Sequence, residues 1–123
     1  MKEATIPFGL PEQIEGMALE TLFLQHLRAY NDYLNLDYSL HYWQTHEGQE
    51  VDFVLYGPRG LVAFEIKRKR FVDKKDLNHL RLFQSDYSVA KCYLLYGGTM
   101  REYHNDIQVI PFLDALKDLQ DLI

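Results

Sequence analysis

Two acidic residues and a lysine are spaced so that a β-hairpin could bring them together. Asp52 lies in an aromatic and β-branched run, 51–56, and Glu65 and Lys67 lie in a second such run, 61–68. Runs of this composition are typical of strands. Hard oxygen ligands with few imidazoles favour Mg²⁺ or Mn²⁺ over zinc, and a lysine beside them could position or activate a metal-bound water or stabilise a pentavalent phosphate.

The segment 57–60, Gly-Pro-Arg-Gly, predicts a type I turn between the two runs. A turn centred between Pro58 and Arg59 pairs residues whose numbers sum to 117. Asp52 then faces Glu65 with their Cβ atoms about 5 Å apart. Two unit charges at this distance repel by about 3 kcal/mol at an effective dielectric constant of 20. A divalent cation would offset this repulsion.

The same register divides the hairpin into two faces. On one face Glu50 lies opposite Lys67 and Val54 opposite Ala63, beside the two carboxylates. The alternative interpretation is a solvated edge, on which the Glu50–Lys67 pair contributes at most about 1 kcal/mol and the carboxylates point into water. The opposite face is apolar and is expected to enter the core; it holds Val51, Phe53, Leu55, Val62, Phe64 and Ile66.

Glu20 interrupts the apolar stripe of the first predicted helix, because its helical neighbours include Met17, Phe23 and Leu24. Its side chain is expected to face inward or to lie at the margin of the stripe. It is either a hydrogen-bonded helix residue, reaching solvent from the margin, or a third acidic ligand pointing at the sheet.

The elements that must position these residues follow from hydrophobic periodicity and turn residues. Their order, αβββαβ plus short strands and a C-terminal helix, predicts an α/β fold with a mixed central sheet flanked by helices. Asp73 is expected to cap the second helix. The predicted helices span 14–33, starting near Pro11, 74–86, and a last segment from Pro111; the predicted strands span 38–43, 51–56, 61–68, 92–96 and short pieces at 103 and 107–110.

Length and composition are those of a single soluble domain: 123 residues, of which 47% are hydrophobic. The lone Cys92 excludes an internal disulfide and favours a reducing compartment. The apolar runs are too short to cross a bilayer and the N-terminus lacks the apolar region of a signal peptide. We therefore expect a cytoplasmic protein without a membrane partner.

Positive charge is concentrated in one stretch. The net charge of −5 divides into +5 over residues 67–75 and −10 elsewhere. A basic cluster of this kind is a candidate surface for the DNA backbone, and a solvated charge run is the alternative. Besides Lys67, the candidate DNA-binding residues are Arg68, Lys69, Arg70, Lys74 and Lys75.

Other catalytic motifs are absent from the sequence. The five histidines show no spacing typical of zinc ligands and are interpreted as incidental. There is no P-loop, and the serines lack a nucleophile-elbow context. Nine tyrosines and Trp43 could stack on bases, but aromatic residues in strands more often fill a sheet face.

The pattern of Glu20, Asp52 and the Glu65-Ile66-Lys67 run resembles the PD-(D/E)XK nuclease superfamily, also called restriction-endonuclease-like. That superfamily has a helix, a three-stranded meander, a helix and a further strand, which is the order expected here. The resemblance implies that Asp52, Glu65 and the Ile66 carbonyl bind Mg²⁺, or alternatively Mn²⁺. It further implies that Lys67 is the catalytic lysine and Glu20 an accessory acid.

More specifically, the motif at 48–53, Gly-Gln-Glu-Val-Asp-Phe, followed by Phe-Glu-Ile-Lys at 64–67, resembles a nuclease-like domain of unknown function. That domain follows the ATPase module in many prokaryotic AAA-type ATPases, and the resemblance spans about residues 13–120. It implies an ATPase module in the same or a partner chain. Residues 1–10 would then be a linker and 11–123 a single nuclease-like domain.

Two further expectations come from this resemblance. Val51 precedes the aspartate where the superfamily motif has proline, which the chemistry does not require. A polar residue of the second helix often assists, and Gln84 or Asn78 could take that place. The sequence thus supports two hypotheses: a Mg²⁺-dependent DNA phosphodiesterase, or a catalytically idle DNA-binding or protein-interaction module on the same fold.

Overall fold

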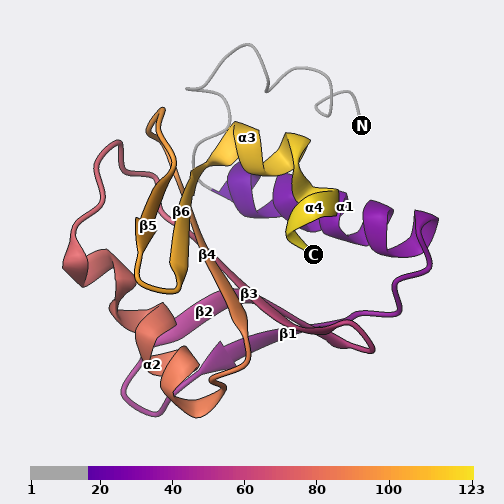
Figure 1. Cartoon of the computed structure of the whole chain (residues 1–123), viewed down its shortest axis with the longest axis horizontal. Coiled ribbons are helices and arrows are strands. Elements are labelled where there is room, and N and C mark those ends of the chain that lie inside the picture. The colour runs from indigo at the N-terminus through magenta and orange to yellow at the C-terminus, as the bar shows by residue number, and fades with distance from the viewer. Residues whose placement is uncertain (1–16) are drawn as a thin grey trace.

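A computed structural model describes residues 17–123 of the chain (Figure 1). The predicted linker 1–10 and the predicted helix start near Pro11 lie outside these residues. No helix among them is long and apolar enough to span a membrane. The elements are α1 (Met17–Tyr33), β1 (Ser39–Gln44), β2 (Glu50–Gly57), β3 (Gly60–Ile66), the 3-10 helix η4 (Lys74–Leu77), α2 (Asn78–Asp86), β4 (Lys91–Tyr96), β5 (Glu102–His104), β6 (Ile107–Pro111), α3 (Phe112–Lys117) and α4 (Leu119–Leu122).

The six described strands form one mixed sheet in the order β1-β2-β3-β4-β6-β5. Strands β1, β2 and β3 are an antiparallel meander, β3, β4 and β6 run parallel, and β5 is antiparallel to β6. The parallel pairs require crossover connections, and the η4–α2 segment supplies the one between β3 and β4. The predicted α/β architecture, a mixed sheet flanked by helices, is confirmed.

Helices cover both faces of the sheet (Figure 1). Helices α1, α3 and α4 pack on one face and α2 packs on the other, because each presents one apolar stripe. Interior strand β4 is covered on both sides: Tyr93 and Leu95 belong to the first core, whereas Cys92, Leu94 and Tyr96 belong to the second. The continuous apolar run at 92–96 indicated this burial.

The hairpin register is confirmed over the pairs from Phe53–Phe64 to Gly57–Gly60. The predicted face of Val51 is wrong. Its side chain lies in the α2-side core and not with Phe53 on the α1 side. The cause is a register shift between β1 and β2, which leaves one extra residue on β2 just before Val54. Such a bulge reverses the alternation of side chains.

Two predicted boundaries also differ from the structure. Strand β3 ends at Ile66 rather than at residue 68, although the Lys67 amide still donates to the Leu95 carbonyl at 2.8 Å. Residues 68–70 are exposed and charged, so they gain nothing by staying over the core. The C-terminal helix is divided at Asp118 into α3 and α4.

The predicted cap at Asp73 is confirmed, but it caps the 3-10 helix η4 and not one continuous helix over 74–86, because α2 begins at Asn78 and its N-cap, Leu77, makes no side-chain cap hydrogen bond. The Asp73 carboxylate accepts hydrogen bonds from the amides of Lys75 and Asp76, and Asp76 reciprocates by accepting from the Asp73 amide at 3.0 Å. A cap of this kind contributes about 1 kcal/mol to stability. It fixes the turn at which the chain leaves the basic loop and enters η4 and then α2.

Candidate active site

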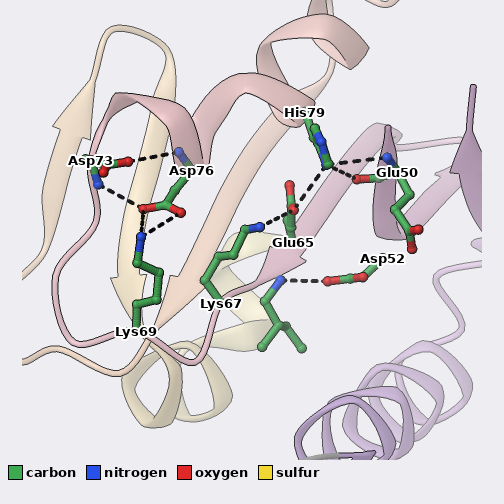
Figure 2. A network of polar contacts seen from close by, with 9 residues as sticks. Glu50, Asp52, Glu65, Lys67, Lys69, Asp73, Asp76 and His79 are labelled. Atoms are coloured by element: carbon green, nitrogen blue, oxygen red, sulfur yellow. Dashed lines mark hydrogen bonds and ion pairs between the residues drawn. The ribbon is translucent and has the colours of Figure 1, made fainter. Parts of the chain in front are cut away.

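The candidate site lies where β2 begins and β3 ends, beside the start of α2 (Figure 2). The start of β2 and the end of β3 bring the charges of Asp52, Glu65 and Lys67 close together. The predicted cross-strand pair Asp52–Glu65 is not part of the β2–β3 register, which ends at Phe53–Phe64. Each of the two carboxyl groups lies near the Lys67 charge, which lowers both pKa values against the stronger effect of burial. The result is a small cluster of ionisable groups with restricted access to water.

Asp52 is half-buried, and its Oδ2 accepts a hydrogen bond from the Ile66 amide at 2.8 Å. Burial raises the pKa of this carboxyl group above its ordinary value, and the nearby charges of Glu20 and Glu50 add to the increase. The Ile66 hydrogen bond favours the ionised form and opposes the shift. This bond joins the two strands and fixes the orientation of the carboxylate.

Glu65 is a charged side chain in the core, with only 4% of its surface exposed. Its Oε2 lies 3.4 Å from Lys67 Nζ, whereas its Oε1 has no hydrogen-bond partner among the described residues. Burial, with a smaller contribution from the Asp52 charge, raises the pKa of Glu65 to about 7 against the opposing effect of Lys67. A buried polar atom without a partner costs free energy, so a ligand that binds it is favoured.

Lys67 lies just beyond β3, with its side chain about one-third exposed. Its ammonium group pairs with Glu65 and not with Glu50, the partner that the hairpin register suggested. Because β3 ends at Ile66, Lys67 is released from the strict cross-strand pairing. Its cation therefore remains close to the buried carboxylate and also reaches the surface.

His79 is a site residue that the sequence interpretation missed. Its Nδ1 lies 3.1 Å from the Glu50 carbonyl oxygen and 3.7 Å from Glu65 Oε2 (Figure 2). The polar residues proposed for this helix lie elsewhere: Asn78 is exposed, and Gln84 lines a separate cavity. One signal was available in the sequence. His79 lies four residues before Phe83, a buried residue of the same helix, so the two side chains share the face that packs on the sheet.

Glu20 lies at the margin of the helix stripe, with 34% of its side chain exposed. Its Oε1 accepts a hydrogen bond from the Arg68 guanidinium at 2.7 Å. This pair links α1 to the segment that follows β3. Glu20 is close enough to raise the pKa of Asp52 but belongs to the outer part of the cluster.

The basic stretch is partly neutralised within the fold. Lys69 contacts both oxygens of Asp76, at 3.0 and 2.8 Å, as Arg68 contacts Glu20. Burial would raise the pKa of Asp76, but the Lys69 hydrogen bond and the Asp73 amide lower it below its ordinary value. The remaining cations, Arg70, Lys74 and Lys75, are exposed and have no ion-pair partner within the described part of the chain.

The site offers few protein ligands, and these are carboxylate oxygens, which suits Mg²⁺ better than a metal whose ligands all come from the protein. Nowhere in residues 17–123 do three or more His, Cys, Asp or Glu side chains form a group able to hold a metal. Mg²⁺ keeps several waters and is commonly bound through one or two carboxylates plus substrate phosphates. The partnerless Oε1 of Glu65 beside Asp52 matches that requirement.

A family model described as a domain of unknown function (DUF4143) matches residues 15–114. The match includes Glu20, Asp52, Glu65, Lys67 and His79. Its description states no activity, so neither the nuclease assignment nor the ATPase context follows from it. A search of curated proteins found no match.

Proposed function

This chain belongs to the DUF4143 family of domains of unknown function, and we propose that it is a Mg²⁺-dependent DNA phosphodiesterase of the PD-(D/E)XK type. One observation carries the proposal. The buried Glu65, with one oxygen partnerless, lies beside Asp52 and within 3.4 Å of the Lys67 ammonium group. Two carboxylates with raised pKa values, one where β2 begins and one where β3 ends, are typical of functional sites.

Asp52, Glu65 and the Ile66 carbonyl would hold the Mg²⁺, or Mn²⁺ in its place. When bound, the cation would polarise the phosphate and lower the pKa of a coordinated water. Asp52 is already oriented by the Ile66 amide, so its free oxygen can serve as a ligand without rearrangement. Glu65 must be ionised to bind, which its pKa of about 7 permits at neutral to alkaline pH.

Lys67 would act on the phosphate rather than on the fold. Its ammonium group is partly exposed and adjoins Glu65, so it can donate a hydrogen bond to a phosphate oxygen held at the same site. Positive charge at this point stabilises the extra negative charge that the phosphate develops during attack. Glu20 would be an accessory acid, held in place by Arg68.

DNA would approach across the loop that follows β3. The exposed cations Arg70, Lys74 and Lys75 follow Lys67 in this loop and have no competing ion pairs among the described residues. Contacts of lysine and arginine with phosphates give affinity that falls with salt. Because Arg68 and Lys69 are paired with acidic residues, they would bind DNA only by exchanging those partners.

A second candidate is a catalytically idle module that binds DNA or a protein partner on the same fold. Asp52, Glu65 and Lys67 already pair with groups of the chain itself, which favours a site stable without metal. In either case the resemblance to a nuclease-like domain that follows the ATPase module of AAA-type ATPases implies an ATPase module in the same or a partner chain. If this second candidate is right, the wild-type chain binds DNA but does not hydrolyse it, and neutralising Arg70, Lys74 and Lys75 together removes the binding.

A cleavage assay on linear, nicked and branched DNA separates the two candidates. With Mg²⁺ or Mn²⁺, the wild-type chain is expected to cleave at least one of these forms, and EDTA should abolish the reaction. Asp52→Asn, which can still accept the Ile66 hydrogen bond, should reduce the rate at least tenfold because it removes a charged ligand. Asp86→Asn, an exposed change at the end of α2, is the matched control and should cleave like wild type. Salt-sensitive DNA binding without cleavage by the folded wild-type chain would favour the idle module.

A further inference from the structure

A cavity of about 420 Å³ opens at the carboxyl ends of the three parallel strands, next to Lys67. Ile66, Tyr96 and Pro111, the last residues of β3, β4 and β6, contribute to its lining. Leu19 of α1 and the 97–99 turn complete the walls. Ligands of open α/β sheets bind at this edge, and sites for small ligands have volumes of roughly 300–1,000 Å³.

The lining combines an apolar interior with cations. Aromatic and aliphatic side chains form most of it, including Tyr96, Phe112 and Leu113. Lys67 and Arg68, which pair with Glu65 and Glu20, also line it, and so does Asp114. A ligand that satisfies both would have a flat apolar body and a negatively charged group. A nucleotide has this chemistry, because the faces of its base are apolar and its phosphate binds cations. Tyr96 and Phe112 are buried, so their rings form the rigid wall behind the base.

The aromatic wall is fixed before any ligand binds. The Tyr96 hydroxyl donates a hydrogen bond to the Met100 carbonyl at 2.5 Å, and the side chain is 3% exposed. Its ring lies against Gly98, where an added Cβ would come within 2.4 Å of Tyr96 Cε2. Glycine at this position therefore allows the 97–99 turn to close over the ring, which holds the ring rigid.

We infer that this cavity binds one unstacked nucleotide of a DNA strand, with the base inside and its phosphate toward Lys67 and Arg68. The inference rests on the proposed function and names its substrate class: single-stranded or locally unpaired DNA. Because Lys67 belongs both to the catalytic cluster and to the cavity lining, the bound nucleotide would adjoin the phosphate that is cleaved. A base in a duplex would first have to be unpaired and flipped out, so intact duplex is disfavoured.

Two variants change the cavity without touching the catalytic cluster. Thr99→Leu places a bulkier side chain at an exposed position of the lining, so the fold should tolerate it. Gly98→Ala displaces the Tyr96 ring and tests the same wall independently. Gln120→Leu, an exposed polar-to-leucine change on α4 outside the lining, is the matched control. Thermal unfolding verifies that each variant is folded.

The test is fluorescence anisotropy of a labelled oligodeoxynucleotide of about twelve nucleotides, in EDTA so that nothing is hydrolysed. We expect the single strand to bind at least fivefold more tightly than the duplex of the same sequence. Thr99→Leu should weaken single-strand binding at least fivefold and leave duplex binding unchanged, while Gln120→Leu should change neither. Equal binding of single strand and duplex, or a folded Thr99→Leu with unaltered preference, would overturn the inference. So would dTMP competing as strongly as the oligonucleotide, because the ligand would then be a free nucleotide.

Binding in EDTA is independent of catalysis, so the two proposals fail separately. A single-strand preference that Thr99→Leu removes, in a chain that cleaves no DNA, would support the nucleotide site and count against the phosphodiesterase. Cleavage that depends on Asp52, with duplex and single strand bound equally, would support the phosphodiesterase and count against the nucleotide site.

Discussion

Replacing Lys67 with methionine is expected to lower the rate of DNA cleavage at least a hundredfold while leaving the fold intact. The side chain is about one-third exposed, so methionine can occupy its place without a cavity. The loss follows from removing a positive charge from the phosphate as negative charge develops on it, an effect of roughly 10²–10³ for one such donor. Single-turnover cleavage of the preferred DNA form measures it.

Removing the lysine also removes a charge that lowers the pKa of Glu65, so the variant carboxyl group should titrate above the wild-type value of about 7. The rate is therefore measured from pH 7 to pH 9. If alkaline pH restores full activity, Lys67 serves only to keep Glu65 ionised and its assignment to the phosphate is wrong. Lys91→Met, an equal loss of charge at an exposed position at the start of β4, should leave the rate unchanged.

Replacing Glu65 with glutamine is expected to make the metal-free protein more stable at alkaline pH, by about 3 kcal/mol. Burial raises the folded-state pKa of Glu65 from its ordinary 4.5 to about 7, so the folded state binds more protons than the unfolded state between these values. The stability that the wild type gains from a protonated Glu65 is therefore present in full below pH 4.5 and is lost as pH rises through 7. Glutamine stays neutral and removes this part of the dependence.

Denaturant unfolding in EDTA from pH 5 to pH 8.5 measures the difference. The two unfolding free energies should differ least at pH 5, by about 1 kcal/mol, and diverge as pH rises, with the glutamine variant the more stable. Glu47→Gln, an exposed change in the β1–β2 turn, should follow the wild-type curve. A glutamine variant with the same pH dependence as wild type would show that Glu65 does not carry a raised pKa.

Local signals in the sequence accounted for much of the hairpin. The Gly-Pro-Arg-Gly turn set the register, and this register placed Asp52 and Glu65 at the same end of neighbouring strands. The bulge before Val54 was beyond such reasoning, because it depends on how β2 pairs with β1. The face of Val51 was therefore wrong and the predicted Asp52–Glu65 pair is missing from the register, although the pairs from Phe53–Phe64 onward were right.

The partners of the charged residues could not be predicted either. Lys67 was expected opposite Glu50 but pairs with Glu65, and Arg68 binds Glu20 from a distant helix. Such pairs depend on where loops leave the sheet and on how α1 packs, which are tertiary features. His79 was missed for the same reason, since its contact with the site arises from the packing of α2 beside β2.

The most direct test of the central claim, that Asp52 and Glu65 together hold a divalent cation, is calorimetric titration of the chain with Mn²⁺ at pH 8. At this pH Glu65 is largely ionised, because its pKa is about 7. The account predicts one Mn²⁺ bound per wild-type chain and an affinity at least tenfold lower for Asp52→Asn, while Asp86→Asn binds like wild type. Equal Mn²⁺ binding by wild type and Asp52→Asn, or no binding by the folded wild-type chain, would contradict it.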